Sequence, residues 1–93
     1  MRRIEHTTAF RRDFKRERRG RHGRRLEALL AGTVGLLVED RPLPPAERDH
    51  ALIGEWRDFR DCHLQPDLVL IYRKQGDDVL QLVRLGSHAE LFG

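Results

Sequence analysis

Residues 68–85 read LVLIYRKQGDDVLQLVRL, and this stretch decides the fold. Its first five residues, 68–72, form a continuous apolar run of strand length, which predicts a central strand covered on both faces. Residues 75–78 (Gln-Gly-Asp-Asp) have the composition of a hairpin turn, and residues 79–85 return as the partner strand. The chain is therefore expected to place an antiparallel hairpin at the centre of a sheet.

The rest of the sheet is predicted upstream of this hairpin. Residues 52–64, with their aromatic side chains, favour one or two strands with a break near Gly54, and residues 2–5 favour an edge strand. The prolines of residues 40–45 exclude both regular helix and a central strand. That segment is therefore expected to be a connecting loop.

Two helices are predicted between the edge strand and this loop. Thr7 or Thr8 can cap the first helix, and Phe10 and Phe14 lie one turn apart on a single face. The second helix is marked by apolar residues at helical spacing, namely Leu26, Leu29, Leu30, Val34 and Leu37. The elements together predict one α+β domain over residues 1–93, with a helical hairpin packed on an antiparallel sheet.

Charge is distributed unevenly along the chain. Residues 1–25 contain eleven Arg or Lys and three acidic residues, a net charge of +8, so the remainder carries −5 of the total of +3. Such a basic segment favours a polyanionic partner, because neutralising phosphates releases counterions. The alternative is a solvated helix surface held by salt bridges.

Cysteine usage and hydropathy indicate the compartment. The single Cys62 cannot form an internal disulfide, so nothing indicates an oxidising environment. The chain has no apolar run long enough to span a membrane, and its N-terminus lacks the apolar core of a signal peptide. We therefore expect a cytoplasmic protein that does not bind membranes.

Three histidines and a carboxylate stand near predicted strand ends. His63 and Asp67 bracket a proline that directs a tight connection, His50 precedes the first strand of the meander, and His88 follows the last strand in a loop. If these strands are neighbours, the four groups converge on one edge of the sheet, with Arg84 close in sequence. Histidine suits the base and the acid of RNA cleavage by the 2′-hydroxyl, because it exchanges protons near neutral pH. Arginine suits stabilisation of the charged phosphorane.

These residues also have structural interpretations. An isolated histidine is more often a surface or hydrogen-bonded residue, and His6 and His22 are assigned to that class. Asp67 after proline fits a turn residue that stabilises its own backbone. Trp56 fits packing better than base stacking, whereas Phe92 either seals the core or stacks on a base.

A metal site is a further alternative for the same side chains. The ligand types for zinc are present in His50, His63, His88, Asp67 and Cys62. None of them shows a compact spacing such as His-x-x-x-His, and in a strand Cys62 and His63 point to opposite faces. The sequence therefore predicts neither a metal nor any other cofactor.

Four blocks in order resemble the YafQ branch of the RelE toxin superfamily. They are DHALIGEW at 49–56, RDCH at 60–63, PD at 66–67 with LIY at 70–72, and RLGSHAELF at 84–92. The likeness spans the whole chain, although the turn at 75–78 is one residue longer than in typical relatives and the first helix uses arginine where they use lysine. It implies a RelE-like fold, with two N-terminal helices packed on a small twisted antiparallel sheet.

The resemblance also implies a function. Members are toxins of type II toxin–antitoxin systems, and they act as mRNA interferases, which are endoribonucleases that cut mRNA in the ribosomal A site without a metal cofactor. The implied partners are the ribosome with its 16S and 23S rRNA, the mRNA substrate, and a cognate antitoxin.

The resemblance assigns roles to individual residues. The family's functional positions fall on His50, His63, Asp67, His88 and Phe92, with Arg84 at a basic position near the site. Our hypothesis for these positions is that Asp67 or His63 is the general base, that His88 is the general acid, and that His50 orients or assists. Of the two substrate-binding residues, Arg84 is expected to stabilise charge and Phe92 to position a base of the RNA.

Two rival functions remain open from the sequence. A ParE-like protein shares the fold but poisons DNA gyrase by binding, and such relatives lack the set of three histidines. A plain basic RNA-binding module would carry the histidines incidentally.

Overall fold

The computed structural model describes all residues 1–93 and contains one five-stranded sheet in the order β1-β5-β4-β3-β2. The strands are β1 (Arg3–His6), β2 (His50–Ala51), β3 (Arg60–Gln65), β4 (Leu68–Gln75) and β5 (Val79–Gly86). β4 lies in the middle, so the predicted central strand and its hairpin with β5 are confirmed. Strands β2 to β5 are antiparallel, but β1 pairs in parallel with β5. The sheet is therefore mixed and not purely antiparallel. Parallel neighbours need a long connection, and the chain between β1 and β5 includes both long helices.

The helices begin and end at local sequence signals. They are α1 (Thr8–Arg18), α2 (Leu26–Val38) and α3 (His88–Phe92), with short 3₁₀ turns η1 (Pro45–Glu47) and η2 (Gly54–Trp56). The side chain of Thr7 accepts a hydrogen bond from the backbone N–H of Phe10, which confirms the predicted cap of α1. The turn after α1 requires glycine, because a Cβ on Gly23 would lie 2.0 Å from the carbonyl oxygen of Arg18.

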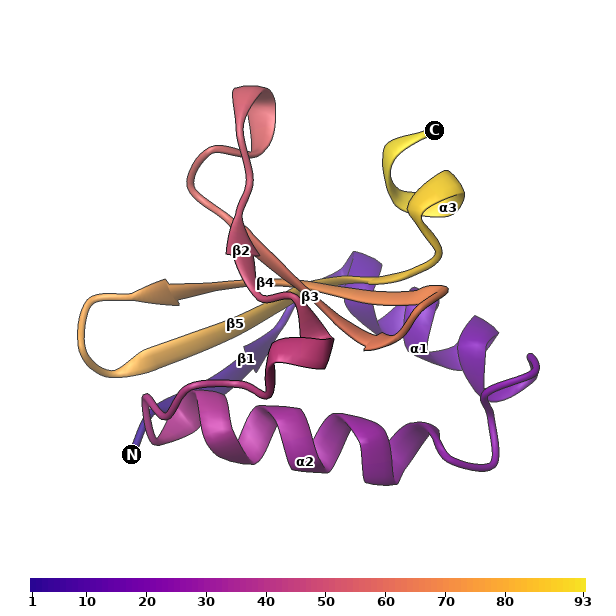
Figure 1. The fold of residues 1–93 in the computed structure, drawn as a ribbon, viewed down its shortest axis with the longest axis horizontal. Helices are drawn as coiled ribbons and strands as arrows, with labels where there is room; N and C mark the ends of the chain where they lie inside the picture. Colours follow the sequence, from indigo (N-terminus) through magenta and orange to yellow (C-terminus); the bar gives the residue numbers. More distant parts are fainter.

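The sheet separates two layers of different size, as Figure 1 shows. Helices α1 and α2 lie on one side, whereas α3 and the loop between β2 and β3 rise from the other. The main contacts of α1 are with β5, and those of α2 are with β3 and β5. Both helices of the predicted hairpin therefore pack on the sheet, and apolar side chains of both belong to one core. No helix combines the length and the apolar character needed to cross a bilayer.

Side-chain alternation along the strands gives the sheet two buried faces. The face under α1 and α2 carries the larger core, which includes Leu68, Leu70 and Tyr72 of β4. The opposite face carries a smaller cluster, in which Val69 and Ile71 pack with Leu91 of α3. β4 is therefore buried on both sides, as its continuous apolar run predicts.

Two placements from the sequence were wrong. His88 is the first residue of α3 and not a loop residue, because a capping box starts the helix there. Oγ of Ser87 accepts from the backbone N–H of Glu90, and Oε1 of Glu90 accepts from the backbone N–H of Ser87. His50 does not precede the first strand of the meander but lies within it, paired with Asp61 of β3. Both changes bring the histidines closer to the sheet.

Candidate active site

Three predicted site residues meet on the face of the sheet opposite the long helices. The ring of His63 lies 5.2 Å from that of His88, and the ring of His88 lies 5.4 Å from that of Phe92 (centroid distances). His63 reaches this face because it pairs with Val69, which belongs to the smaller cluster. The structure thus brings together side chains from β3 and α3 that are about 25 residues apart in the chain.

The short helix α3 positions two of these side chains. His88 and Phe92 are four residues apart and therefore project from the same side of the helix. Leu91 is buried against the sheet, and Glu90 lies 3.1 Å from Nε of Arg16 in an ion pair (Oε2 to Nε). The buried leucine and this ion pair hold α3 against the body of the protein.

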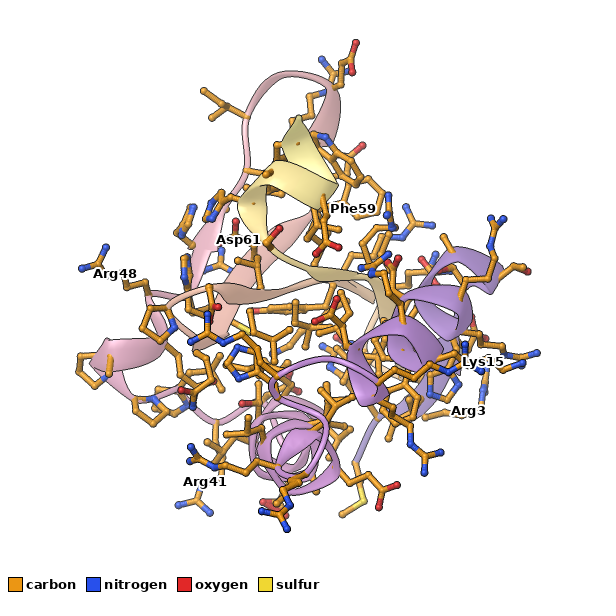
Figure 2. All side chains as sticks on the ribbon, turned by 90° about the vertical axis from the view of Figure 1, so that its right-hand side faces the viewer. Arg3, Lys15, Arg41, Arg48, Phe59 and Asp61 are labelled. Carbon is orange, nitrogen blue, oxygen red and sulfur yellow. The ribbon has the colours of Figure 1, made fainter.

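Asp61 is the site residue that the sequence interpretation missed. Its side chain is 1% exposed and lies between β2 and α3, as Figure 2 shows. Oδ1 accepts no hydrogen bond, and its ion-pair partner is Nδ1 of His50 at 3.1 Å. Burial raises the pKa of Asp61, whereas His50, His63 and His88 act in the opposite direction when they are charged. The alternation of β3 was the available signal, since Asp61 and His63 are two residues apart and must share a face.

The contacts of His50 define which ring nitrogen is free. Nδ1 lies 2.7 Å from the carbonyl oxygen of Arg48 and 3.1 Å from Oδ1 of Asp61. Both neighbours are acceptors, so the proton of a neutral imidazole sits on Nδ1. Nε2 is then unprotonated and can accept a proton from a substrate.

A shallow pocket of about 250 Å³ opens above these groups. It is lined by His50, Leu52, Ile53, Trp56, Asp61, His88 and Phe92. Trp56 packs edge-on against Phe59 and Phe92, with ring centroids 5.4 and 5.9 Å apart, so it both packs, as expected, and forms a wall of the pocket. Phe92 is 39% exposed, so part of its ring is accessible from solvent. The pocket combines proton-transfer groups with apolar walls.

Three predicted site residues, His63, Asp67 and Arg84, do not line this pocket, although the ring of His63 lies beside that of His88. Asp67, in the turn between β3 and β4, pairs with His22 at 2.8 Å and with Arg21 at 3.0 Å. The hydrogen bond from His22 lowers the pKa of Asp67. Arg84 contacts Asp13 of α1 through two nitrogens, at 2.6 and 3.2 Å. Their roles in catalysis and substrate binding stay predictions.

The remaining candidate ligands and histidines lie elsewhere. Cys62 is buried in the larger core, where burial raises the pKa of its thiol, and it faces away from His63. No group of three His, Cys, Asp or Glu side chains has an arrangement that could hold a metal ion. His6 stacks on Phe10 at 5.4 Å, and His22 binds Asp67, which agrees with the structural interpretation of both.

The basic N-terminal segment is mostly free of salt bridges. Four of its eleven cationic residues form ion pairs: Arg2, Arg3, Arg16 and Arg21. The other seven form none, namely Arg11, Arg12, Lys15, Arg18, Arg19, Arg24 and Arg25. Figure 2 shows Lys15 on the outer side of α1. This surface is therefore available to an external polyanion, and the salt-bridge alternative does not account for it.

An apolar groove of about 540 Å³ lies between α1 and α2. Its apolar lining is Ile4, Phe10, Phe14, Leu30, Ala31, Val34 and Leu82. Three cationic side chains, Arg11, Lys15 and Arg18, also line it. The groove suits an amphipathic segment that carries acidic residues along its edges.

Comparisons with known proteins agree with this geometry. Residues 2–93 match the family described as "Bacterial toxin of type II toxin-antitoxin system, YafQ". The mRNA interferase toxin YafQ of Escherichia coli strain K12 is 38% identical over 92 residues, which cover 97% of this chain and 95% of that protein.

Solved structures show the same fold. YafQ in the E. coli DinJ–YafQ complex is 36% identical with a TM-score of 0.80, and the match covers 100% of both chains. A metal-bound toxin from Helicobacter pylori is 43% identical with a TM-score of 0.82, over 99% of this chain and 100% of that one. These findings confirm the predicted RelE-like fold and give no support to the ParE-like alternative. The chain belongs to the YafQ family of toxins of type II toxin–antitoxin systems.

Proposed function

We propose that this toxin is a metal-independent endoribonuclease that cuts mRNA on the ribosome in the cytoplasm. One observation carries the proposal: His50, His63 and His88 surround the buried Asp61 beside a pocket with an exposed aromatic wall. The name of the E. coli relatives, mRNA interferase, supports the same reaction class. RNA supplies its own nucleophile, so the protein needs only a base, an acid and charge stabilisation.

The reaction is a transfer of the phosphate to the 2′-oxygen. The 2′-hydroxyl loses its proton to a base as its oxygen bonds to the adjacent phosphorus. The bond from phosphorus to the 5′-oxygen then breaks, and an acid protonates that oxygen. The products are a 2′,3′-cyclic phosphate and a free 5′-hydroxyl.

The geometry favours histidines for both proton transfers. His50 presents an unprotonated Nε2, and His88 stands at the exposed start of α3 as the acid. The ring of His63 lies beside that of His88, tilted by 41°, and His63 is the second candidate base. Asp67 is the weaker candidate, because His22 and Arg21 already bind its carboxylate. A positioned acid or base contributes on the order of 10²–10⁴-fold, so loss of either is measurable.

Asp61 acts on the histidines and not on the RNA. It is buried below them and stabilises an imidazolium as the base gains its proton. Phe92 and Trp56 hold a base of the mRNA by stacking beside the reacting phosphate.

The unpaired cationic surface of α1 and the segment that follows it docks on ribosomal RNA. Affinity should then fall steeply with salt, because each neutralised phosphate releases counterions. The apolar groove between α1 and α2 receives a helix of the cognate antitoxin, whose acidic side chains meet Arg11, Lys15 and Arg18. The antitoxin and the ribosomal RNA then compete for the same cationic side chains, so a bound antitoxin prevents the toxin from docking on the ribosome.

The test is primer-extension mapping of a translating mRNA with the wild type, His88→Ala and the control His6→Ala. His6 is a matched control because it stacks on Phe10 outside the pocket. We expect discrete, EDTA-resistant cuts from the wild type and the control and none from His88→Ala. Intact RNA with arrested growth would overturn the proposal and favour a gyrase poison.

A further inference from the structure

The strand that carries His50 is too short to hold its side chain by itself. β2 consists of His50 and Ala51 alone, lies at the edge of the sheet, and pairs only with Asp61 and Arg60. Both of its residues are exposed. A two-residue edge strand with few tertiary contacts opens readily. Contacts outside β2 must therefore hold the ring of His50 against the carbonyl oxygen of Arg48 and the carboxylate of Asp61.

A hydrogen-bonded anchor lies directly below this strand. The hydroxyl of Tyr72 donates to Oδ1 of Asp49, and Nε of Arg60 donates to the same oxygen at 3.2 Å. Tyr72 is 1% exposed and belongs to the larger core under the long helices. Burial, and the carboxylate of Asp49, raise the pKa of Tyr72, so its hydroxyl stays protonated and remains a donor.

The register joins three strands at this level. Arg60 of β3 pairs with Ala51 of β2 on one side and with Tyr72 of β4 on the other. Asp49 and His50 are consecutive, so the two side chains leave the chain on opposite faces of the sheet. The carboxylate of Asp49 is hydrogen-bonded to Tyr72 of the core, whereas the next side chain, His50, lines the active-site pocket.

The anchored turn also supplies an acceptor for His50. Arg48, immediately before Asp49, has a φ of 49° in the left-handed region and directs its carbonyl oxygen to Nδ1 of His50 at 2.7 Å. If Asp49 were released, the turn and this carbonyl would lose their fixed place. The ring would then be free to rotate and to exchange its tautomer.

We propose that Tyr72, Arg60 and Asp49 form a positioning unit that holds His50 with Nδ1 hydrogen-bonded to the carbonyl oxygen of Arg48, beside Oδ1 of Asp61, and with Nε2 free toward the substrate. This inference rests on the proposed role of His50 in RNA cleavage. Tyr72 itself does not touch the RNA, because it lies on the other face of the sheet. It acts through Asp49 and the turn at Arg48 that precedes it.

Tyr72→Phe tests the unit, since it removes one hydroxyl and keeps the ring in the core. We expect kcat for cleavage on the ribosome to fall about 10- to 100-fold with little change in KM, because small misplacement of a catalytic group costs rate. The ring ¹⁵N resonances of His50 should change from the Nδ1–H form to a mixture of tautomers. The control is Val79→Ala, which truncates a buried side chain on β5 and tests for a general loss of stability.

A double-variant comparison separates positioning from stability. In a His50→Ala background, Tyr72→Phe should have no further effect on kcat, and Asp49→Asn should behave like Tyr72→Phe in the wild-type background. Equal losses with and without His50, or an unchanged His50 ring spectrum in Tyr72→Phe, would overturn the inference. Full activity of His50→Ala would instead refute its role in the proposed function, while the ring spectra would still decide the anchoring.

Discussion

Replacing Asp61 by asparagine should make this toxin more stable and less active at the same time. The carboxylate is buried, Oδ1 accepts no hydrogen bond, and burial raises its pKa. A buried polar group that makes no hydrogen bond costs about 1–3 kcal/mol, more if it is charged. Asparagine has nearly the same shape, keeps a carbonyl oxygen for His50, and removes the buried charge.

The sign of the pH dependence follows from the raised pKa of Asp61. Below its ordinary value the group is protonated in both the folded and the unfolded state, so the two proteins should be equally stable there. As pH rises through the ordinary value, the unfolded wild type ionises first, and the wild type loses stability until the pH passes the folded value. The advantage of Asp61→Asn should therefore be largest at pH values above the folded pKa of Asp61, where the buried carboxyl of the wild type is fully ionised.

Thermal unfolding followed by circular dichroism from pH 4 to 8 measures this difference. A gain of about 1 kcal/mol raises Tm by roughly 4–8 °C in a domain of this size. Cleavage by the same variant should fall, because no carboxylate then stabilises the imidazolium. A variant that is less stable than the wild type at pH 8, or a difference independent of pH, would show that Asp61 is stabilised by partners and refute the reasoning.

Three further predictions follow from the ion pairs and the basic surface. Asp13→Ala should destabilise the fold by about 3 kcal/mol in urea unfolding, because it leaves the partly buried Arg84 without its carboxylate; a loss below about 1 kcal/mol would contradict this. Asp67→Asn should leave Tm almost unchanged, since the carboxylate is exposed to solvent, so a loss of cleavage at unchanged Tm would support its predicted catalytic role. Combined Arg18→Glu and Arg19→Glu substitutions should weaken ribosome binding and flatten its salt dependence in sedimentation assays, while unchanged binding would exclude this surface as the RNA contact.

Local signals in the sequence determined much of the architecture. The apolar run of β4 is buried on both faces, the turn that follows closes a hairpin with β5, and Thr7 caps α1. Each of these features depends on residues within a few positions of one another, and side-chain type and spacing report such short-range preferences directly. The histidines and Phe92 were predicted as site residues from their residue types and from the family resemblance, and their roles stay predictions.

Only the tertiary structure decided how those residues are arranged. Asp61 becomes a buried carboxylate under three histidines because β2 pairs with β3 in one register and α3 folds back over the sheet. Arg84 meets Asp13 across 71 positions, and Asp67 meets His22 across 45. Such contacts depend on which distant elements lie on the same face of the sheet, and the composition of the individual segments does not specify that arrangement. The sequence thus determined the elements and the reactive groups, whereas long-range packing determined which of those groups share the pocket.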